Sequence, residues 1–165
     1  MSDNTKETIE FDVNMNAGIL YDYMLYHIYR SPIGIIGTVV GMLLLANYFR
    51  GRELLYLIFG IIVVFYLPVN LYTSSKRQML MVESYKSPLH YTLSEEGIRV
   101  SQGELDQGHE WGRVIKAVAT SKSIFLYTGK NVATIFPRKD MGDQTESVIR
   151  MISRYVEPGK VKIRF

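Results

Sequence analysis

Two long apolar runs dominate the first half of the chain. They cover residues 31–49 and 54–75, and only residues 50–53 separate them. At a helical rise of about 1.5 Å per residue the runs are roughly 28 and 33 Å long, close to the roughly 30 Å of a bilayer's hydrocarbon core. Neither run contains a charged residue. A buried helix of a soluble protein is the alternative for each run, but two such runs favour a transmembrane hairpin over residues 31–75.

Basic residues near the ends of the two runs indicate the orientation of the hairpin. The side that holds the chain termini carries Arg30, Lys76, Arg77 and Lys86, whereas the loop between the runs carries Arg50 and Arg52. Segments rich in Lys and Arg tend to stay in the cytoplasm. The bias predicts a multi-pass protein of the cell membrane with both termini and the soluble domain in the cytoplasm.

The pattern changes twice before the hairpin. Ile9, Phe11, Val13 and Met15 alternate with polar residues, which is the period of a strand that buries one face. Asn16 is then placed to cap a tyrosine-rich helix over residues 17–29. Residues 1–30 are thus predicted to form an N-terminal strand and a helix that lies at the membrane interface or extends the first span.

Short apolar stretches separated by turn residues predict strands after Pro88. The first two, 89–93 and 98–101, flank the turn 94–97. A loop over 102–108 precedes the stretch 109–111, and further β-rich runs follow at 114–120, 124–128 and 132–136. Short strands joined by tight turns indicate an antiparallel meander.

The last part of the chain changes to a helical period. Val148, Ile149, Ile152 and Tyr155 recur at helical spacing, and Asp143 is the predicted N-cap. The predicted fold class is an α+β membrane protein, in which the transmembrane hairpin is followed by an antiparallel β-sheet domain with one C-terminal helix over residues 76–165. This outline is pleckstrin-homology-like (PH-like), although small α+β sheets of other topologies share it.

Four segments in a fixed order carry a family resemblance. They are YTLSEEGI at 91–98, WGRVIK at 111–116, FLYTGK at 125–130 and FPRK at 136–139. Together with the apolar hairpin they resemble the bacterial YcxB-like family over nearly the whole chain. The resemblance implies a small bacterial inner-membrane protein with a PH-like cytoplasmic domain, and it implies no activity, because the family offers no catalytic residues to carry over. Gly112 and Arg113 depart from the small or acidic pair expected after Trp111.

The charge of the chain is unevenly divided. Residues 1–75 hold four Lys or Arg against six Asp or Glu, a net of −2, while residues 76–165 hold fifteen against ten, a net of +5. The basic part lacks a dense stripe of cations with exposed aromatic residues, which argues against nucleic acid as a partner. The absence of cysteine excludes disulfides and thiolate chemistry.

The sequence shows no catalytic constellation. It contains no phosphate-binding glycine loop with Lys and Ser or Thr, no HExxH and no GxSxG. The densest group of polar ligands, Glu104, Asp106, His109 and Glu110, is interpreted as a solvated loop rather than a metal site. We therefore predict a protein that is not an enzyme, with no catalytic residue, cofactor or metal.

Basic residues after the hairpin are expected to contact anionic lipid, each contributing on the order of 1 kcal/mol of attraction. The predicted headgroup-binding residues are Lys76, Arg77, Lys86, Arg138 and Lys139, and Lys160, Lys162 and Arg164 extend this set if the domain docks on the bilayer. Small residues in the first span, Gly34, Gly37 and Gly41, predict a helix-packing face that serves either the hairpin itself or contact between protomers.

Two functions remain open at this point. The first is a non-catalytic, membrane-anchored binding or scaffold module that recruits a protein partner or a lipid headgroup. Such a module self-associates as a homo-oligomer through its spans or its domain, and residues 160–165 have the alternation needed to add a strand to a neighbouring sheet. The alternative is an accessory subunit of a larger membrane enzyme or transporter complex.

Overall fold

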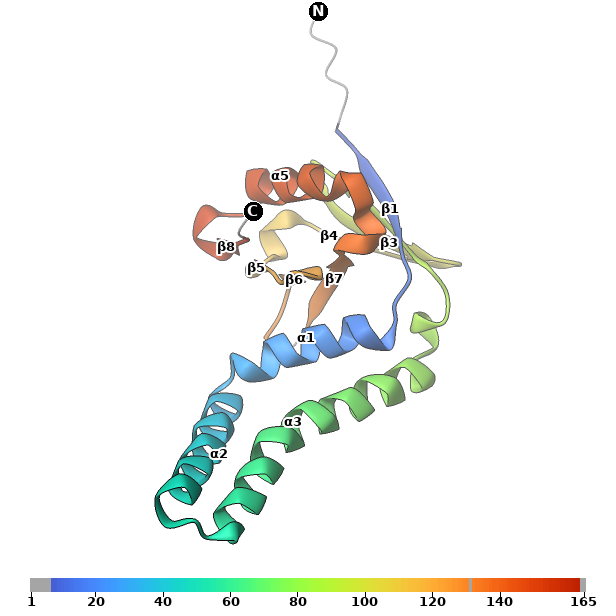
Figure 1. The fold of residues 1–165 in the computed structure, drawn as a ribbon. Helices are drawn as coiled ribbons and strands as arrows, with labels where there is room; N and C mark the ends of the chain where they lie inside the picture. Colours follow the sequence, from blue (N-terminus) through green and yellow to red (C-terminus); the bar gives the residue numbers. More distant parts are fainter. Residues whose placement is uncertain (1–6, 131, 164–165) are drawn as a thin grey trace, which may run out of the picture.

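The computed structural model of the chain describes residues 7–130 and 132–163. A β-rich body carries a pair of long helices that project from one side (Figure 1). One strand and one helix precede the long helices, and the other strands and the C-terminal helix follow them. The predicted order of apolar helical hairpin, β-sheet and C-terminal helix is therefore confirmed.

The two apolar runs form the helices α2 (Pro32–Gly51) and α3 (Leu54–Met81). Both are long and apolar enough to cross a membrane, and little of either is buried within the chain. Large side chains such as Ile33 and Phe49 are 72% and 79% exposed. Helix α3 continues past residue 75 and ends before the short 3-10 turn η1 (Glu83–Tyr85).

Glycines set the contact between the two long helices. Gly41 of α2 lies against Val63 and Val64 of α3, and Gly60 of α3 lies against Leu45 of α2. Because a side chain at Gly41 or Gly60 would collide with the opposite helix, these positions allow the two backbones to approach closely. Of the predicted packing residues, Gly37 and Gly41 therefore face α3, whereas Gly34 lies against the Ile28 carbonyl before the start of α2.

Helix α1 (Ala17–Tyr29) connects the hairpin to the β-rich body. Asn16 caps it as predicted, since its Oδ1 accepts a hydrogen bond from the Ile19 N–H at 3.0 Å. On one side the Tyr21 ring contacts Tyr72 of α3 with 5.7 Å between centroids, and on the other Tyr26 contacts Phe125 at 5.5 Å. The helix therefore lies between α3 and the second sheet.

The first sheet has four antiparallel strands. They are, in spatial order, β1 (Ile9–Val13), β2 (Leu89–Ser94), β3 (Gly97–Gln102) and β4 (Leu105–His109). Strand β1 pairs with β2 in a register that puts Phe11 opposite Tyr91, so the helical hairpin is inserted between two paired strands. The loop predicted over 102–108 is wrong from Leu105 onward, because those residues form β4. The pattern of the sequence does not reveal β4, because this exposed edge strand lacks the apolar alternation by which strands are recognised.

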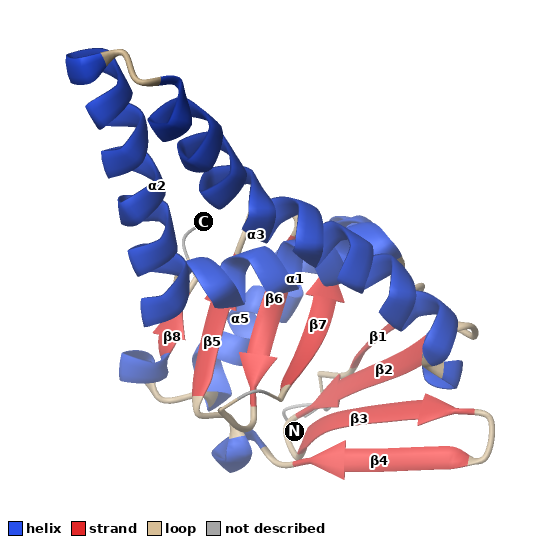
Figure 2. Cartoon of the chain, turned by 90° about the horizontal axis from the view of Figure 1, so that it is seen from below, coloured by secondary structure: helices blue, strands red, loops and turns tan. Residues whose placement is uncertain are grey.

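The second sheet has the strand order β7-β6-β5-β8 (Figure 2). Its strands are β5 (Lys116–Ala119), β6 (Ser123–Tyr127), β7 (Ala133–Pro137) and β8 (Val161–Lys162). The predicted antiparallel pairing of consecutive strands is confirmed within each sheet, but the strands divide between two sheets instead of forming one meander, and β8 runs parallel to β5. Of the tail that is predicted to add a strand to a neighbouring sheet, Val161 and Lys162 instead complete the second sheet of the same chain.

Helices cover both faces of the second sheet. All five residues of β6 are buried, whereas side chains on a strand alternate between two faces, so both faces must be covered. Tyr23 of α1 contacts Phe125 from one side at 5.4 Å between ring centroids. Helix α5 (Thr145–Tyr155) lies on the opposite side in Figure 1 and buries Val148 and Ile152.

Short helical turns close the body. In η2 (Trp111–Arg113) the Trp111 Nε1–H donates to the Ser94 carbonyl at 2.8 Å, and the indole stacks on Tyr155 at 5.8 Å. The predicted N-cap of the last helix is wrong, because Asp143 lies inside η3 (Gly142–Gln144) and α5 begins at Thr145. The remaining short elements are α4 (Arg138–Met141) and η4 (Pro158–Lys160).

Candidate functional site

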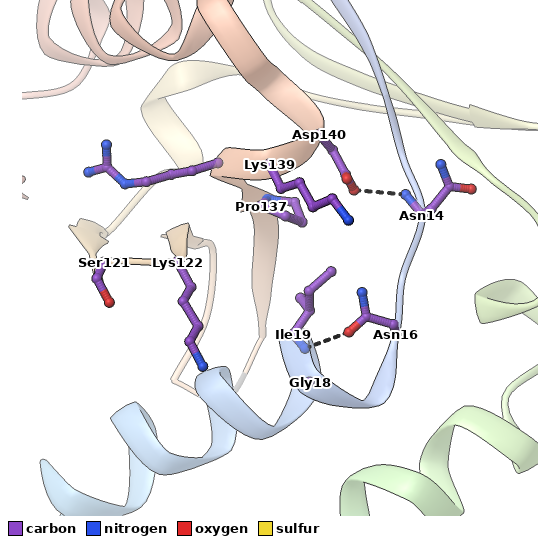
Figure 3. Close-up of a pocket in the computed structure, with 10 residues that line it drawn as sticks. Asn14, Asn16, Gly18, Ile19, Ser121, Lys122, Pro137, Lys139 and Asp140 are labelled. Carbon is purple, nitrogen blue, oxygen red and sulfur yellow. Dashed lines mark hydrogen bonds between the residues drawn. The ribbon is translucent and has the colours of Figure 1, made fainter.

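A cavity of about 690 Å³ opens beside the start of α1. Three segments that are distant in sequence line it, namely the corner between β1 and α1, the turn between β5 and β6, and the junction of β7 with α4. In Figure 3 the side chains of Lys122 and Lys139 extend from two of these segments into the space in front of the corner. We call this cavity and the hollow that continues it the cleft.

Cations predominate in the cleft. Lys122, Arg138 and Lys139 line the cavity, and none of them takes part in an ion pair within the described residues. The backbone holds Arg138 in place, since its N–H donates to the Lys122 carbonyl at 2.8 Å and its Nε–H donates to the Thr120 carbonyl at 3.3 Å. The two lysines therefore keep their charge available to a ligand.

Two carboxylates beside the cleft are held by neutral donors. Asp140 accepts a hydrogen bond from the Asn14 backbone N–H at 3.0 Å, a contact drawn in Figure 3. Asp22 of α1 accepts from the Thr120 hydroxyl at 2.7 Å. The first contact ties the segment after β1 to α4, and the second ties α1 to the turn between β5 and β6. They offset part of the cationic charge without cancelling it, because neither carboxylate pairs with a Lys or Arg among the described residues.

A second hollow of about 640 Å³ continues the cleft along α1. It shares Ser121 and Arg138 with the first cavity and adds Arg30 and Lys162. Arg30 stands directly before the N-cap of α2, and its guanidinium lies over the Tyr26 ring at 5.1 Å. The cleft thus extends from the start of α1 toward the start of the first apolar helix.

The predicted headgroup-binding residues separate into two groups. Arg138 and Lys139 line the cleft, but Lys76, Arg77 and Lys86 do not. The Lys76 ammonium lies over the Tyr72 ring at 4.6 Å on α3, and Lys86 pairs with Glu83 at 3.2 Å. Lys162 of the tail lines the second hollow, and Arg164 lies outside the described residues.

Lys122 is the member of the cleft that sequence reasoning did not select. It stood in a short turn and carried no motif of its own. A signal was nevertheless present, because residues 112–139 contain no Asp or Glu but six cations: Arg113, Lys116, Lys122, Lys130, Arg138 and Lys139. Strands β5, β6 and β7 of the second sheet come from this acid-free segment, which accounts for the basic character of the cleft.

The polar loop predicted to be solvated proves to be the exposed strand β4. Asp106 pairs with Arg99 of the neighbouring strand at 3.3 Å. Within the described residues no group of three or more His, Cys, Asp or Glu is arranged to hold a metal ion.

Burial raises the pKa of three tyrosines in the body. Desolvation raises the pKa of Tyr91 to about 12, and Tyr85 adds to the shift. The pKa values of Tyr23 and Tyr127 are raised as well, first by desolvation and then by neighbouring phenols. These hydroxyls stay neutral at physiological pH and add no negative charge beside the cleft.

The architecture defines an α+β protein in which two long apolar helices are inserted between the first two strands of a sheet. A family model described as YcxB-like protein matches residues 93–152, which extend from the end of β2 into α5. This segment is therefore similar to the YcxB-like family, and the resemblance inferred from the sequence is confirmed there. The comparisons with curated proteins and with solved structures gave no match.

Proposed function

We propose that this protein is a non-catalytic binding module anchored in the cell membrane, and that its cleft binds an anionic group. Helices α2 and α3 cross the membrane as a hairpin, and the Lys and Arg bias places the β-rich body in the cytoplasm. Two small sheets with one helix near the C-terminus agree in outline with a PH-like domain. The fold by itself names no ligand, so the proposal depends on the cleft.

The observation that carries the proposal is the pair Lys122 and Lys139 on one cavity. The two residues come from different connections of the second sheet, and neither has an ion-pair partner among the described residues. Unpaired ammonium groups on a concave surface attract anions, and they hold best a ligand with several oxygen acceptors. A phosphate group fits this description, and it could belong to a lipid headgroup or to a soluble phosphorylated ligand.

Binding is best tested with the full-length protein in lipid nanodiscs. Pyrophosphate would be titrated calorimetrically into protein in phosphatidylcholine discs, and native mass spectrometry would count the phosphatidylglycerol retained from mixed discs. The test variant is Lys122→Ala combined with Lys139→Ala. Lys160→Ala is the control, because Lys160 pairs with Glu157 and does not line the cleft.

Each outcome has a defined meaning. If the double variant loses pyrophosphate binding and the Lys160→Ala control keeps it, the result supports a soluble phosphorylated ligand. If the double variant loses retained phosphatidylglycerol and the control keeps it, the result supports a lipid headgroup as the ligand. The cleft is excluded as an anion site if the double variant behaves as the parent in both assays. Release of the parent from native membranes by alkaline carbonate would refute the anchor itself.

We also propose that the apolar helices bind protein partners. Large apolar side chains on the outer faces of α2 and α3 offer surfaces for a homo-oligomer or for the accessory-subunit role. Purification in mild detergent followed by mass spectrometry separates these cases. A homogeneous self-assembly supports the scaffold function, whereas a second protein in fixed stoichiometry supports the accessory subunit.

A further inference from the structure

A second surface lies where helix α1 meets helix α2, away from the cavity beside the start of α1. Its described members are Arg30, Ile115, Lys116, Lys130 and Val132, which we call the junction face. Arg30, Ile115, Lys116 and Lys130 line one hollow of about 320 Å³ together with Ser31 and Pro32, the N-cap and first residue of α2. This part of the β-rich body therefore faces the start of the first apolar helix across the hollow.

Two apolar side chains project from the junction face. Ile115 is 51% exposed and Val132 is 64% exposed. Hydrogen bonds place them on either side of the end of β6, because the Ile115 N–H donates to the Tyr127 carbonyl at 2.8 Å and the Thr128 N–H donates to the Val132 carbonyl at 3.1 Å. Gly129 and Lys130, which follow β6, line the same hollow as Arg30 at the end of α1.

Cations surround these apolar side chains. The Lys116 ammonium lies over the Tyr127 ring at 5.7 Å, and Arg30 lies over Tyr26. Lys130 completes the set, and no carboxylate of a described residue forms an ion pair with any of the three. Apolar tips among cations are the chemistry of a surface that rests on an anionic bilayer, where the tips enter the interface and the cations contact headgroups.

The corner between α1 and α2 is tightly built. The Ser31 side chain donates to the Ile28 carbonyl at 2.6 Å and accepts from the Gly34 N–H at 3.3 Å. Gly34 leaves no room for a side chain, because a Cβ there would collide with the Ile28 carbonyl. Such a corner fixes the end of α1, and with it Arg30 of the junction face, relative to the first residues of α2.

We propose that the junction face docks on the cytoplasmic surface of the same bilayer that the hairpin crosses, with Ile115 and Val132 inserted between anionic headgroups. This inference rests on the membrane anchoring proposed above. The bilayer is the occupant that the geometry favours, because Pro32 already marks the point where the chain enters it. The cavity that Lys122 and Lys139 line has no residue in common with the junction face, although the hollow that continues it shares Arg30.

The absence of cysteine from the sequence allows a direct test with single labels. Val132→Cys and Ile115→Cys would each carry an NBD fluorophore in the full-length protein, reconstituted in discs of phosphatidylcholine with phosphatidylglycerol. Leu105→Cys is the matched control, because Leu105 is 62% exposed on β4, outside the junction face. Val40→Cys, in the middle of α2, reports on the hairpin itself.

Docking predicts that spin-labelled lipid quenches the labels at 132 and 115 several-fold more than the label at 105. Lys116→Gln combined with Lys130→Gln should reduce this quenching, as should discs without phosphatidylglycerol or high salt. Equal quenching at 132, 115 and 105, with strong quenching at 40, would overturn the docking and leave the anchor intact. Absence of lipid quenching at 40 would instead refute the anchor.

Discussion

Gly41 of α2 and Val64 of α3 are in such close contact that a Cβ added to the glycine would lie 2.6 Å from Val64 Cγ2. The Val64 backbone nitrogen would lie 3.3 Å from the same Cβ, so rotation of the valine side chain cannot fully relieve the clash. Gly37, one helical turn earlier, has only Leu67 within reach, at 3.6 Å. Gly37 and Gly41, two of the three residues of the predicted glycine face, thus differ in how closely they approach the second helix.

Replacement of Gly41 by alanine should destabilise the hairpin by about 1–3 kcal/mol, the usual effect of overpacking a close contact. Gly37→Ala is the matched control and should be near neutral, because its new methyl group would meet Leu67 at ordinary contact distance. Thermal unfolding in mild detergent measures both variants. Equal transition temperatures for the two would show that the helices are packed less closely than described.

Two substitutions of Asn16 separate its role as a helix cap from the effect of charge in the cleft. Asn16→Ala removes the acceptor of the Ile19 N–H and should cost about 1 kcal/mol of stability. Asn16→Asp keeps an acceptor for that N–H, but it places a negative charge on the wall of the cavity. We expect the aspartate variant to unfold as the parent does and to bind pyrophosphate several-fold more weakly. Calorimetric titration measures the affinity for pyrophosphate, and chemical unfolding measures the stability. Equal affinity in the aspartate variant and the parent would contradict the prediction.

Asp140 should weaken anion binding through its own negative charge. Asp140→Asn keeps a carbonyl oxygen for the Asn14 N–H and removes the charge, so the affinity of the cleft for pyrophosphate should rise several-fold. Asp106→Asn changes the net charge equally on β4, where Asp106 pairs with Arg99, and serves as the control. An equal gain in both variants would mean that only the overall charge of the protein matters.

Stability should fall at alkaline pH because of buried tyrosine. Burial raises the pKa of Tyr91 to about 12 from the ordinary value of 10.0. The unfolded chain therefore releases this proton first as the pH rises, and the stabilisation, complete below pH 10, is lost between about pH 10 and 12. Tyr91→Phe should match the parent at pH 7 and lose about 2 kcal/mol less by pH 12.

Chemical unfolding of the detergent-solubilised protein at several pH values measures this difference. The phenylalanine ring preserves the contacts of Tyr91 with Phe11 and Phe136, whose centroids lie 5.9 and 5.0 Å away. A variant that lost stability in parallel with the parent would assign the alkaline sensitivity to other groups.

Local sequence was sufficient for most elements. Asn16 was recognised as a cap because the hydrogen bond that it accepts comes from a residue three positions away. The apolar runs were recognised as helices because their length and composition require no knowledge of the rest of the fold. Asp143 was a plausible cap by the same local rule, but the turn η3 occupies that position and α5 begins two residues later.

The sequence by itself determined the apolar hairpin, the cap of α1, the β-rich second half and the C-terminal helix, because each depends on periodicity or on contacts between near neighbours. Only the tertiary structure decided that β1 pairs with β2 across the hairpin, that β8 lies parallel to β5, and that Lys122 and Lys139 share one cavity. Strand pairing and cavity formation join segments that are distant along the chain. Their positions follow from how α1 and α5 cover the second sheet, which no local pattern records.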